Sequence, residues 1–325
     1  ALTVVIHHYH YVFNKFNELT IQSLPFFSFL NIFYKYGPYA VHVFFVISGF
    51  IFSYVYLNQK KIKTKEFFIN RFARLYPLHF ITLLFVLYLS TIDTKFANYF
   101  LNAPNPIYTD LYHFVLQLFF ISHWGLQEGA SFNTPSWSIS VEIMMYIIFF
   151  LSLKYLKKYI LSVSIIIILL SFVFYKFTNL FTFNEYALLF FLGVFIYQII
   201  KFKKSKMIIF LSIFFLILSF VGNFKILLFC PSLLVFSVQI DFLIKNKKIT
   251  ELFNFFGNLS YSMYMLHFPL MILFLLFENL KIINENFYFN SSFLIFFILL
   301  LTLLSFVSFK FFEYPINKKI RSKLL

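Results

Sequence analysis

The chain alternates between long apolar runs and short polar connections. A helix of about 20 apolar residues spans the hydrocarbon core of a bilayer, because an α-helix rises about 1.5 Å per residue. Runs of this kind predict ten membrane helices, and a shorter apolar run at residues 111–122 predicts an interfacial or re-entrant helix rather than an eleventh span. The ten lie near residues 1–14, 37–57, 74–92, 136–153, 158–176, 184–200, 206–222, 225–244, 257–278 and 290–312.

The pattern predicts one all-α polytopic membrane protein. The sequence contains no internal repeat, soluble domain or low-complexity tail, so we expect a single transmembrane domain over residues 1–325. Because the chain begins at Ala1 inside an apolar run, we expect the first helix to be truncated. No basic segment of a signal peptide precedes that run.

Lysine and arginine gather in alternate connections. Membrane proteins concentrate these residues on the cytoplasmic side. The alternation therefore predicts that both termini are cytoplasmic and that the long connection 93–135 lies on the outer side. The basic segments 58–74, 154–158, 201–206, 245–251 and 310–325 carry 6, 3, 4, 3 and 5 of the 27 Lys and Arg residues.

Composition narrows the class further. The chain is 61% hydrophobic and only 12% charged, which is typical of a membrane protein and not of a soluble domain. Its net charge of +15 does not favour nucleic-acid binding, since the basic residues are split among short clusters. Cys230 is the single cysteine, which excludes an intrachain disulfide and a multi-cysteine metal site. We expect it to be buried.

A polar stretch heads the predicted helix 136–153. Trp137, Ser138, Ser140 and Glu142 lie in Pro135-Ser-Trp-Ser-Ile-Ser-Val-Glu142. A carboxylate at the mouth of a membrane helix is costly and indicates a functional site. Glu142 follows Ser138 by four residues, so the two share a helix face.

Histidines also lie inside predicted spans. His7, His8 and His10 are in the first span, and His267 lies near the middle of the ninth, close to Pro269. An imidazole titrates near neutral pH and can act as a general base or acyl acceptor. A metal site is less favoured, because no further ligand is spaced to join the first three. The alternative for His267 is a structural histidine satisfied by a neighbouring helix.

Other residues have two interpretations each. Arg71 and Arg74 share one helix face at the membrane boundary and suit phosphate groups, although simple anchoring is the alternative. Ser48 and Gly49 favour close helix packing. His42, near the outer end of the second span, is an unusual charge-capable residue there.

Taken in order, six motifs resemble those of the acyltransferase-3 family, and they extend over nearly the whole chain. They are Val4–Tyr11, the Phe-Phe-Val-Ile-Ser-Gly-Phe run at 44–50, Arg71-x-x-Arg74-x-x-Pro77, Trp137-Ser-x-Ser-x-Glu142, Ser260-Tyr-Ser-x-Tyr-x-x-His267-x-Pro269 and Glu313-x-Pro315. The resemblance implies a ten-helix O-acyltransferase of the bacterial cytoplasmic (inner) membrane. Such enzymes move an acyl group, usually acetyl, from cytoplasmic acyl-CoA to a hydroxyl of an envelope glycan or lipid-linked saccharide.

The resemblance also implies roles for residues. The catalytic histidine of the family aligns best with His8, while His7 and His10 stay open. The paired arginines match Arg71 and Arg74, which we expect to hold coenzyme A phosphates.

On the same basis we expect Glu142 to orient or charge His8, and Trp137, Ser138, His42 and His267 to contact the acceptor; no metal is implied. His42 departs from the family pattern, which has an acidic residue at that position.

Two other classes of function remain open at this point. Intramembrane His and Glu residues and a proline within a helix also suit a transporter or flippase for a lipid-linked saccharide or acyl carrier. An assembly subunit without activity is the third alternative. The absence of an inverted repeat favours the transferase over transport.

Overall fold

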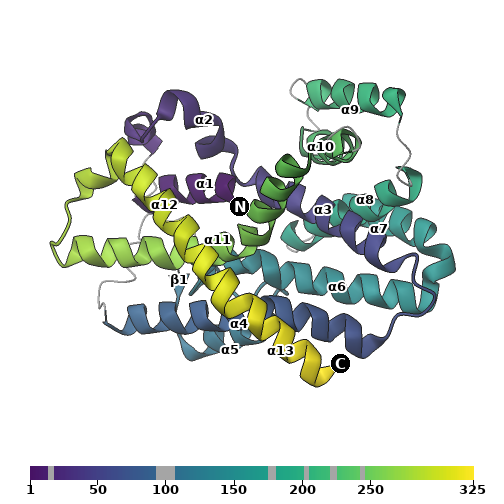
Figure 1. The fold of residues 1–325 in the computed structure, drawn as a ribbon, viewed down its shortest axis with the longest axis horizontal. Helices are drawn as coiled ribbons and strands as arrows, with labels where there is room; N and C mark the ends of the chain where they lie inside the picture. Colours follow the sequence, from purple (N-terminus) through teal and green to yellow (C-terminus); the bar gives the residue numbers. More distant parts are fainter. Residues whose placement is uncertain (14–17, 93–106, 175–180, 201–204, 220–224, 242–245) are drawn as a thin grey trace. The chain divides into compact units, whose positions relative to one another are not determined.

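The computed structural model describes residues 1–325 except 14–17, 93–106, 175–180, 201–204, 220–224 and 242–245 (Figure 1). Parts of the predicted connection 93–135 and of the basic segments 201–206 and 245–251 therefore lie outside the described residues. The described chain is mostly helical, as the sequence predicts. Its strands are β1 (Ile107–Tyr108) and β2 (Ala130–Ser131), which pair in parallel with Ile107 opposite Ala130.

The chain folds as two compact units. The first comprises residues 1–37, 63–140 and 253–325, and the second comprises residues 38–62 and 141–252. The first unit contains α1 (Leu2–Phe13), η1 (Glu18–Ser23), α2 (Phe27–Tyr36), α4 (Thr64–Ile92), α5 (Leu111–Leu118), η3 (Thr134–Ser136), most of α11 (Lys247–Asn279), η5 (Glu285–Phe289), α12 (Ser291–Val307), η6 (Ser308–Glu313) and α13 (Tyr314–Leu324).

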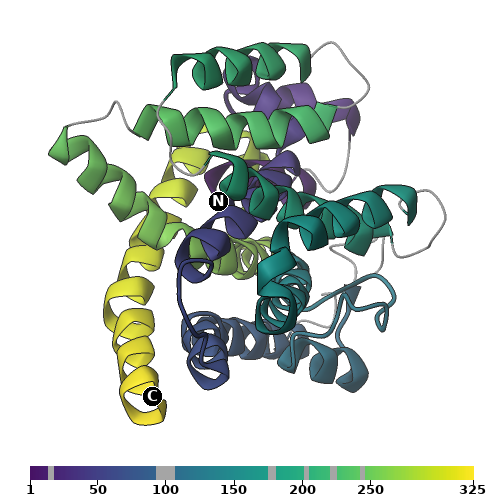
Figure 2. The same cartoon turned by 90° about the vertical axis from the view of Figure 1, so that its right-hand side faces the viewer.

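The second unit continues α6 (Trp137–Leu156), whose first residues belong to the first unit. It also contains α3 (Tyr39–Tyr56), η4 (Lys157–Tyr159), α7 (Ile160–Phe174), α8 (Phe181–Ile200), α9 (Lys206–Ser219) and α10 (Lys225–Asp241). Helix α8 packs against both α3 and α7. Helices α9 and α10 lie side by side in both ribbon views (Figures 1 and 2).

A helix is present at each of the ten predicted positions. Among the described residues, six helical stretches are long and apolar enough to cross a membrane: Tyr39–Tyr56, Thr64–Ile92, Thr134–Phe174, Phe183–Ile200, Lys247–Asn279 and Ser291–Leu324. Large apolar side chains are exposed along α7, α9 and α12. Such surfaces suit a lipid environment, so the protein is an integral membrane protein. The count of ten spans, the sidedness of the termini and the single domain stay predictions.

Two helices begin well before the apolar runs that predicted them. Helix α4 starts at Thr64 rather than near residue 74, and α11 starts at Lys247 rather than near residue 257. The preceding residues mix polar and apolar side chains but include no proline or glycine, so nothing stops the helix from extending into them. Arg71 and Arg74 consequently lie inside α4.

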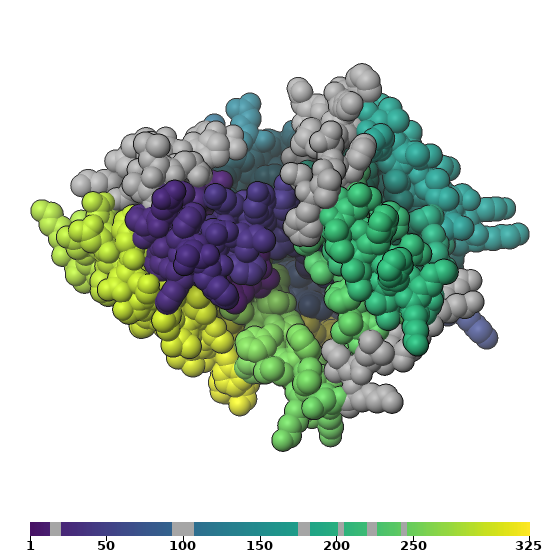
Figure 3. All heavy atoms as spheres, turned by 90° about the horizontal axis from the view of Figure 1, so that it is seen from above, coloured from purple at the N-terminus to yellow at the C-terminus, as the bar shows by residue number. Residues whose placement is uncertain are grey.

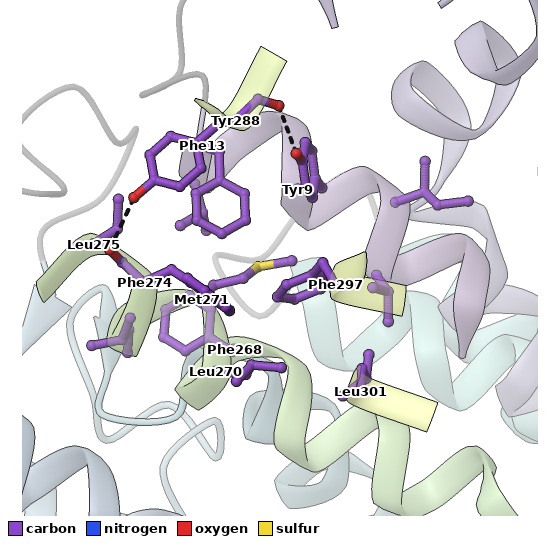
Figure 4. Close-up of a cluster of buried hydrophobic side chains, with 14 of the residues drawn as sticks. Tyr9, Phe13, Phe268, Leu270, Met271, Phe274, Leu275, Tyr288, Phe297 and Leu301 are labelled. Carbon is purple, nitrogen blue, oxygen red and sulfur yellow. Dashed lines mark hydrogen bonds between the residues drawn. The ribbon is translucent and has the colours of Figure 1, made fainter. Parts of the chain in front are cut away.

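The core of the first unit surrounds α1. Tyr9 donates a hydrogen bond to the carbonyl of Tyr288 (2.6 Å), and the ring of Phe13 stacks on that of Tyr288 at 4.3 Å (Figure 4). Tyr288 in turn donates to the carbonyl of Phe274 (2.9 Å). In the space-filling view, N-terminal residues in purple lie against C-terminal residues in yellow (Figure 3). This packing fixes α1 against α11 and α12.

The second unit depends on close contact between α3 and α8. A Cβ added at Gly49 would lie 1.9 Å from the carbonyl oxygen of Phe190, and one at Gly193 would lie 2.0 Å from that of Val46. The two glycines therefore let the backbones meet without side chains between them, as small residues do between membrane helices. The packing role predicted for Gly49 fits this contact.

We expect Gly49→Ala to lower the free energy of unfolding by about 1–3 kcal/mol, because the new methyl group overlaps rigid backbone. Gly257→Ala is the matched control, since a Cβ at Gly257 meets nothing within 4 Å in α11. Thermal unfolding in detergent measures both. Equal stability of the two variants would show that α3 and α8 do not meet in this way.

Candidate active site

A pair of histidines joins α1 to α11. His8 Nδ1 lies 2.7 Å from His267 Nε2, and the two rings are parallel to within 5° with centroids 5.0 Å apart. The residues are 259 positions apart in sequence, so only the packing of α1 against α11 brings them together. His267 is fully buried, whereas His8 is partly exposed.

The hydrogen bonds assign the protons of the neutral pair. His267 Nδ1 lies 3.2 Å from the carbonyl oxygen of Met263, which can only accept, so Nδ1 carries the proton. Nε2 of neutral His267 then accepts, and His8 Nδ1–H is its donor. His8 Nε2 is left as an unprotonated nitrogen, and among the described residues it has no hydrogen-bond partner.

The other histidines of α1 are buried. His7 Nδ1 donates to the carbonyl of Tyr34 (2.6 Å), and a Cβ at Gly37 would lie 2.2 Å from the Cβ of His7. His10 is 1% exposed. Of the three histidines that the sequence left open, His8 is therefore the one that is only partly buried.

The Trp-Ser motif approaches this pair through Tyr264 of α11. Tyr264 Oη donates to the carbonyl of Pro135 (2.7 Å), and Ser138 Oγ lies 2.8 Å from Tyr264 Oη and 3.3 Å from the same carbonyl oxygen. The rings of Tyr264 and His267 have centroids 5.8 Å apart. Ser138 is thus joined to His8 by a chain of two side chains, Tyr264 and His267.

Ser140 fixes the turn that precedes the motif. Its Oγ donates to the carbonyl of Phe120 (2.8 Å) and accepts from the backbone N–H of His123 (3.1 Å), while its carbonyl accepts from Trp124 Nε1 (2.9 Å). Phe120 has a φ of 57°, which is uncommon for a residue with a side chain. The hydrogen bond from Ser140 helps to hold that strained backbone in place.

The same turn reaches α4 close to the arginines. The ring centroid of Phe120 is 5.9 Å from that of Tyr76 and 4.0 Å from that of His79, and His79 Nε2 donates to the carbonyl of Gln117 (2.8 Å). Tyr76 follows Arg74 by two residues, or about 3 Å along the helix. Residues 111–122 contain only the short helix α5, and their contact with α4 fits the re-entrant alternative.

Positive charge gathers around the first part of α4. Arg74 is exposed and Arg71 partly exposed, and α13, whose four basic side chains are exposed, packs against α4. Glu313, which accepts hydrogen bonds from Ser262 (2.6 Å) and Ser308 (2.7 Å), lies within electrostatic reach of Arg74. The arginines and the basic helix therefore form one cationic surface of the first unit.

Glu142 belongs to the second unit, where two hydroxyl groups hold it. Ser48 Oγ donates to Glu142 Oε1 (2.9 Å), and Tyr146 donates to the same oxygen. Glu142 is 3% exposed. Ser48 thus has a polar partner in addition to its place in the α3 packing. The predicted pairing of Glu142 with His8 stays a prediction.

His42 has an acidic partner that the sequence did not indicate. Its Nε2 lies 2.9 Å from Glu185 Oε1, and its Nδ1 lies 3.1 Å from the carbonyl of Pro38. The carbonyl of Pro38 can only accept, so Nδ1 is the donor to it, and Nε2 faces the carboxylate of Glu185. At the position where the motif pattern leads us to expect an acid, this chain has a histidine that contacts an acid of α8. The departure at His42 was the signal that could have prompted a search for Glu185.

The geometry describes an integral membrane protein with a buried, titratable histidine pair next to serine and tyrosine hydroxyl groups. Within the described residues, no three His, Cys, Asp or Glu side chains are grouped so that they could hold a metal ion.

The chain belongs to the acyltransferase-3 family, whose acyltransferase domain matches residues 1–310. The family inferred from the motifs is thus confirmed. The chain is similar to the acyltransferase MdmB of Streptomyces mycarofaciens, with 33% identity over 127 residues, which are 38% of this chain and 30% of that protein. No solved structure matches the chain.

His123 generates a prediction about pH. Burial beside Trp137 lowers the pKa of His123 from 6.5 to about 4. In the unfolded chain the ring takes up a proton at higher pH, so acid favours unfolding. His123 contributes at most about 3 kcal/mol to the free energy of unfolding. This contribution is complete above about pH 6.5 and is lost as the pH falls to about 4.

We expect His123→Gln to be less sensitive to acid than the unmodified protein across this window. Unfolding in detergent at a series of pH values measures the difference. Identical pH slopes for both proteins would contradict the burial of this ring.

Proposed function

We propose that the protein is a membrane O-acyltransferase that moves an acyl group, acetyl in the simplest case, from cytoplasmic acyl-CoA to a hydroxyl of a cell-envelope carbohydrate. The acceptor is a glycan or a lipid-linked saccharide, and the membrane is the bacterial inner membrane. Membership of the family supports the reaction class. The proposal rests on the unprotonated Nε2 of His8, which has no hydrogen-bond partner among the described residues, and on the hydrogen bond between His8 Nδ1 and His267 Nε2.

His8 is the general base of the proposed reaction. Its Nε2 takes the proton of the acceptor hydroxyl as the oxygen attacks the thioester carbonyl. A C–O bond forms, the C–S bond breaks, and the thiolate of coenzyme A receives the proton from His8. The hydrogen bond from Nδ1 to His267 fixes the orientation of the His8 ring, so that Nε2 is the nitrogen left to take the proton. The same bond stabilises the imidazolium that forms.

The donor end of the site is the cationic surface on α4. Arg71 and Arg74 bind phosphates of coenzyme A, and the neighbouring α13 adds to the positive potential. Tyr261 of α11 donates to the carbonyl of Leu75, beside Arg74. His267 lies six residues further along α11, or roughly 9 Å. The pantetheine arm of coenzyme A can extend over this distance.

Trp137 and Ser138 contribute to the acceptor end of the proposed site. Trp137 is partly exposed, and its ring lies 5.7 Å from that of His123, so a sugar can stack on this face. Glu142, which lies in the Trp-Ser motif of the family, is assigned to the support of His8. His42, which departs from the family pattern, is assigned to acceptor binding.

We expect His8→Ala to lower the acyl-transfer rate by about a hundred- to ten-thousand-fold, the range typical of a lost general base. The assay incubates purified protein with radiolabelled acetyl-CoA, with and without envelope glycan, and measures the coenzyme A released. Envelope O-acetylation in cells with and without the gene identifies the glycan.

His10→Gln is the control on the same helix, because His10 is buried away from the pair. Near-normal activity of His8→Ala would sink the assignment of the base. Release of coenzyme A without acceptor would show an acyl-enzyme, and no release by the unmodified protein would favour transport or an inactive subunit.

We expect Arg74→Ala to raise the KM for acetyl-CoA about tenfold, because a charge-assisted hydrogen bond to phosphate is lost. The KM for S-acetylpantetheine, which has no phosphate, should not change. Lys65→Ala, an exposed cation on the same helix, is the control. An equal increase for both donors would mean that Arg74 does not contact phosphate.

A further inference from the structure

Pro269 leaves one carbonyl of α11 without its usual partner. In an α-helix the N–H of each residue bonds the carbonyl four residues earlier. Proline has no N–H, so the carbonyl of Met265 receives no bond from position 269. Inside a membrane this group needs another donor, because neither lipid nor bulk water supplies one.

Asn133 supplies that donor. Its Nδ2 lies 3.0 Å from the carbonyl oxygen of Met265, and the residue is 1% exposed. Its Oδ1 has no hydrogen-bond partner among the described residues. A side chain selected only to fill space would be apolar here, since a buried, unpaired oxygen is destabilising. The bond from Nδ2 therefore explains why an asparagine occupies this position.

The hydrogen bond from Asn133 to Met265 holds residues 133–138, which include the start of the Trp-Ser motif, beside the histidine pair. Asn133 lies two residues before Pro135, whose carbonyl bonds Tyr264, and Met265 lies two residues before His267. The hydrogen bonds of Tyr264 and Met265 together attach residues 133–138 to α11 at two adjacent positions. A segment held at two points cannot pivot about either one.

We infer that Asn133 and Pro269 form a positioning device: the proline frees the Met265 carbonyl, and Asn133 binds it to set Trp137 and Ser138 against His8 and His267. The inference rests on the proposed function for its effect on catalysis. Asn133 is a positioning residue, because it acts through Met265 and the segment that follows it.

A double-mutant cycle tests the device. Asn133→Ala should lower kcat about tenfold, with a smaller change in the KM for acetyl-CoA. In a Pro269→Ala background the N–H of the new alanine bonds Met265, so Asn133→Ala should cost less than about twofold. An equal loss in both backgrounds would overturn the inference.

Two further variants separate the loss of the hydrogen-bond donor at position 133 from a general loss of packing. Asn133→Leu keeps a similar side-chain volume but has no donor, and should lose as much activity as Asn133→Ala. Pro231→Ala removes the proline inside α10 of the second unit, and Asn133→Ala should still lose about tenfold in that background. Full activity of Asn133→Leu, or rescue by Pro231→Ala, would contradict the mechanism.

Hydrogen–deuterium exchange of residues 130–140 gives a readout that does not depend on the chemistry. Asn133→Ala should speed exchange there, and Pro269→Ala should suppress the increase. If this coupling is found while His8→Ala stays active, only the assignment of His8 as the base fails. If it is found while the unmodified protein releases no coenzyme A, the proposed function fails and the positioning device stands. If exchange shows no coupling, the device fails whatever the activity of the His8 variant.

Discussion

The structure of the first unit depends on a polar stretch in the middle of α11, from Tyr261 to His267. Each polar group there bonds a different element: Tyr261 bonds α4, Ser262 bonds Glu313, and Tyr264 bonds the segment before α6. Met265 and His267 add the bonds from Asn133 and to His8. Because unpaired polar groups are costly inside a membrane, each pairing constrains where its neighbouring element can lie.

Contacts of the same kind bear on where the Trp-Ser motif lies relative to Arg71 and Arg74. The charge pattern predicts that the Trp-Ser stretch lies on the outer side, opposite Arg71 and Arg74. In the structure, Ser140 bonds Phe120, and the ring of Phe120 rests on α4 only a few residues beyond Arg74. The turn at Phe120 therefore joins the motif to α4 at Tyr76, two residues after Arg74.

Most of the helices could be predicted from the sequence, because each has an apolar run long enough to identify it. The contacts of the candidate site could not. Helical periodicity gives the face on which His8 lies, but not that His267 lies opposite, since the two come from helices at opposite ends of the chain. Asn133 and Glu185 were missed because a single polar residue outside a motif gives no signal until its partner is known.

The Phe-Phe-Val-Ile-Ser-Gly-Phe run shows why packing and chemistry need not be alternatives. Successive residues of a helix point about 100° apart. Gly49 faces α8 and allows the two backbones to touch, while Ser48 faces α6 and donates to Glu142. The close contact that Gly49 permits also fixes the rotation of α3 about its own axis. That rotation directs the Ser48 hydroxyl, so the position of Glu142 depends on a residue that makes no polar contact with it.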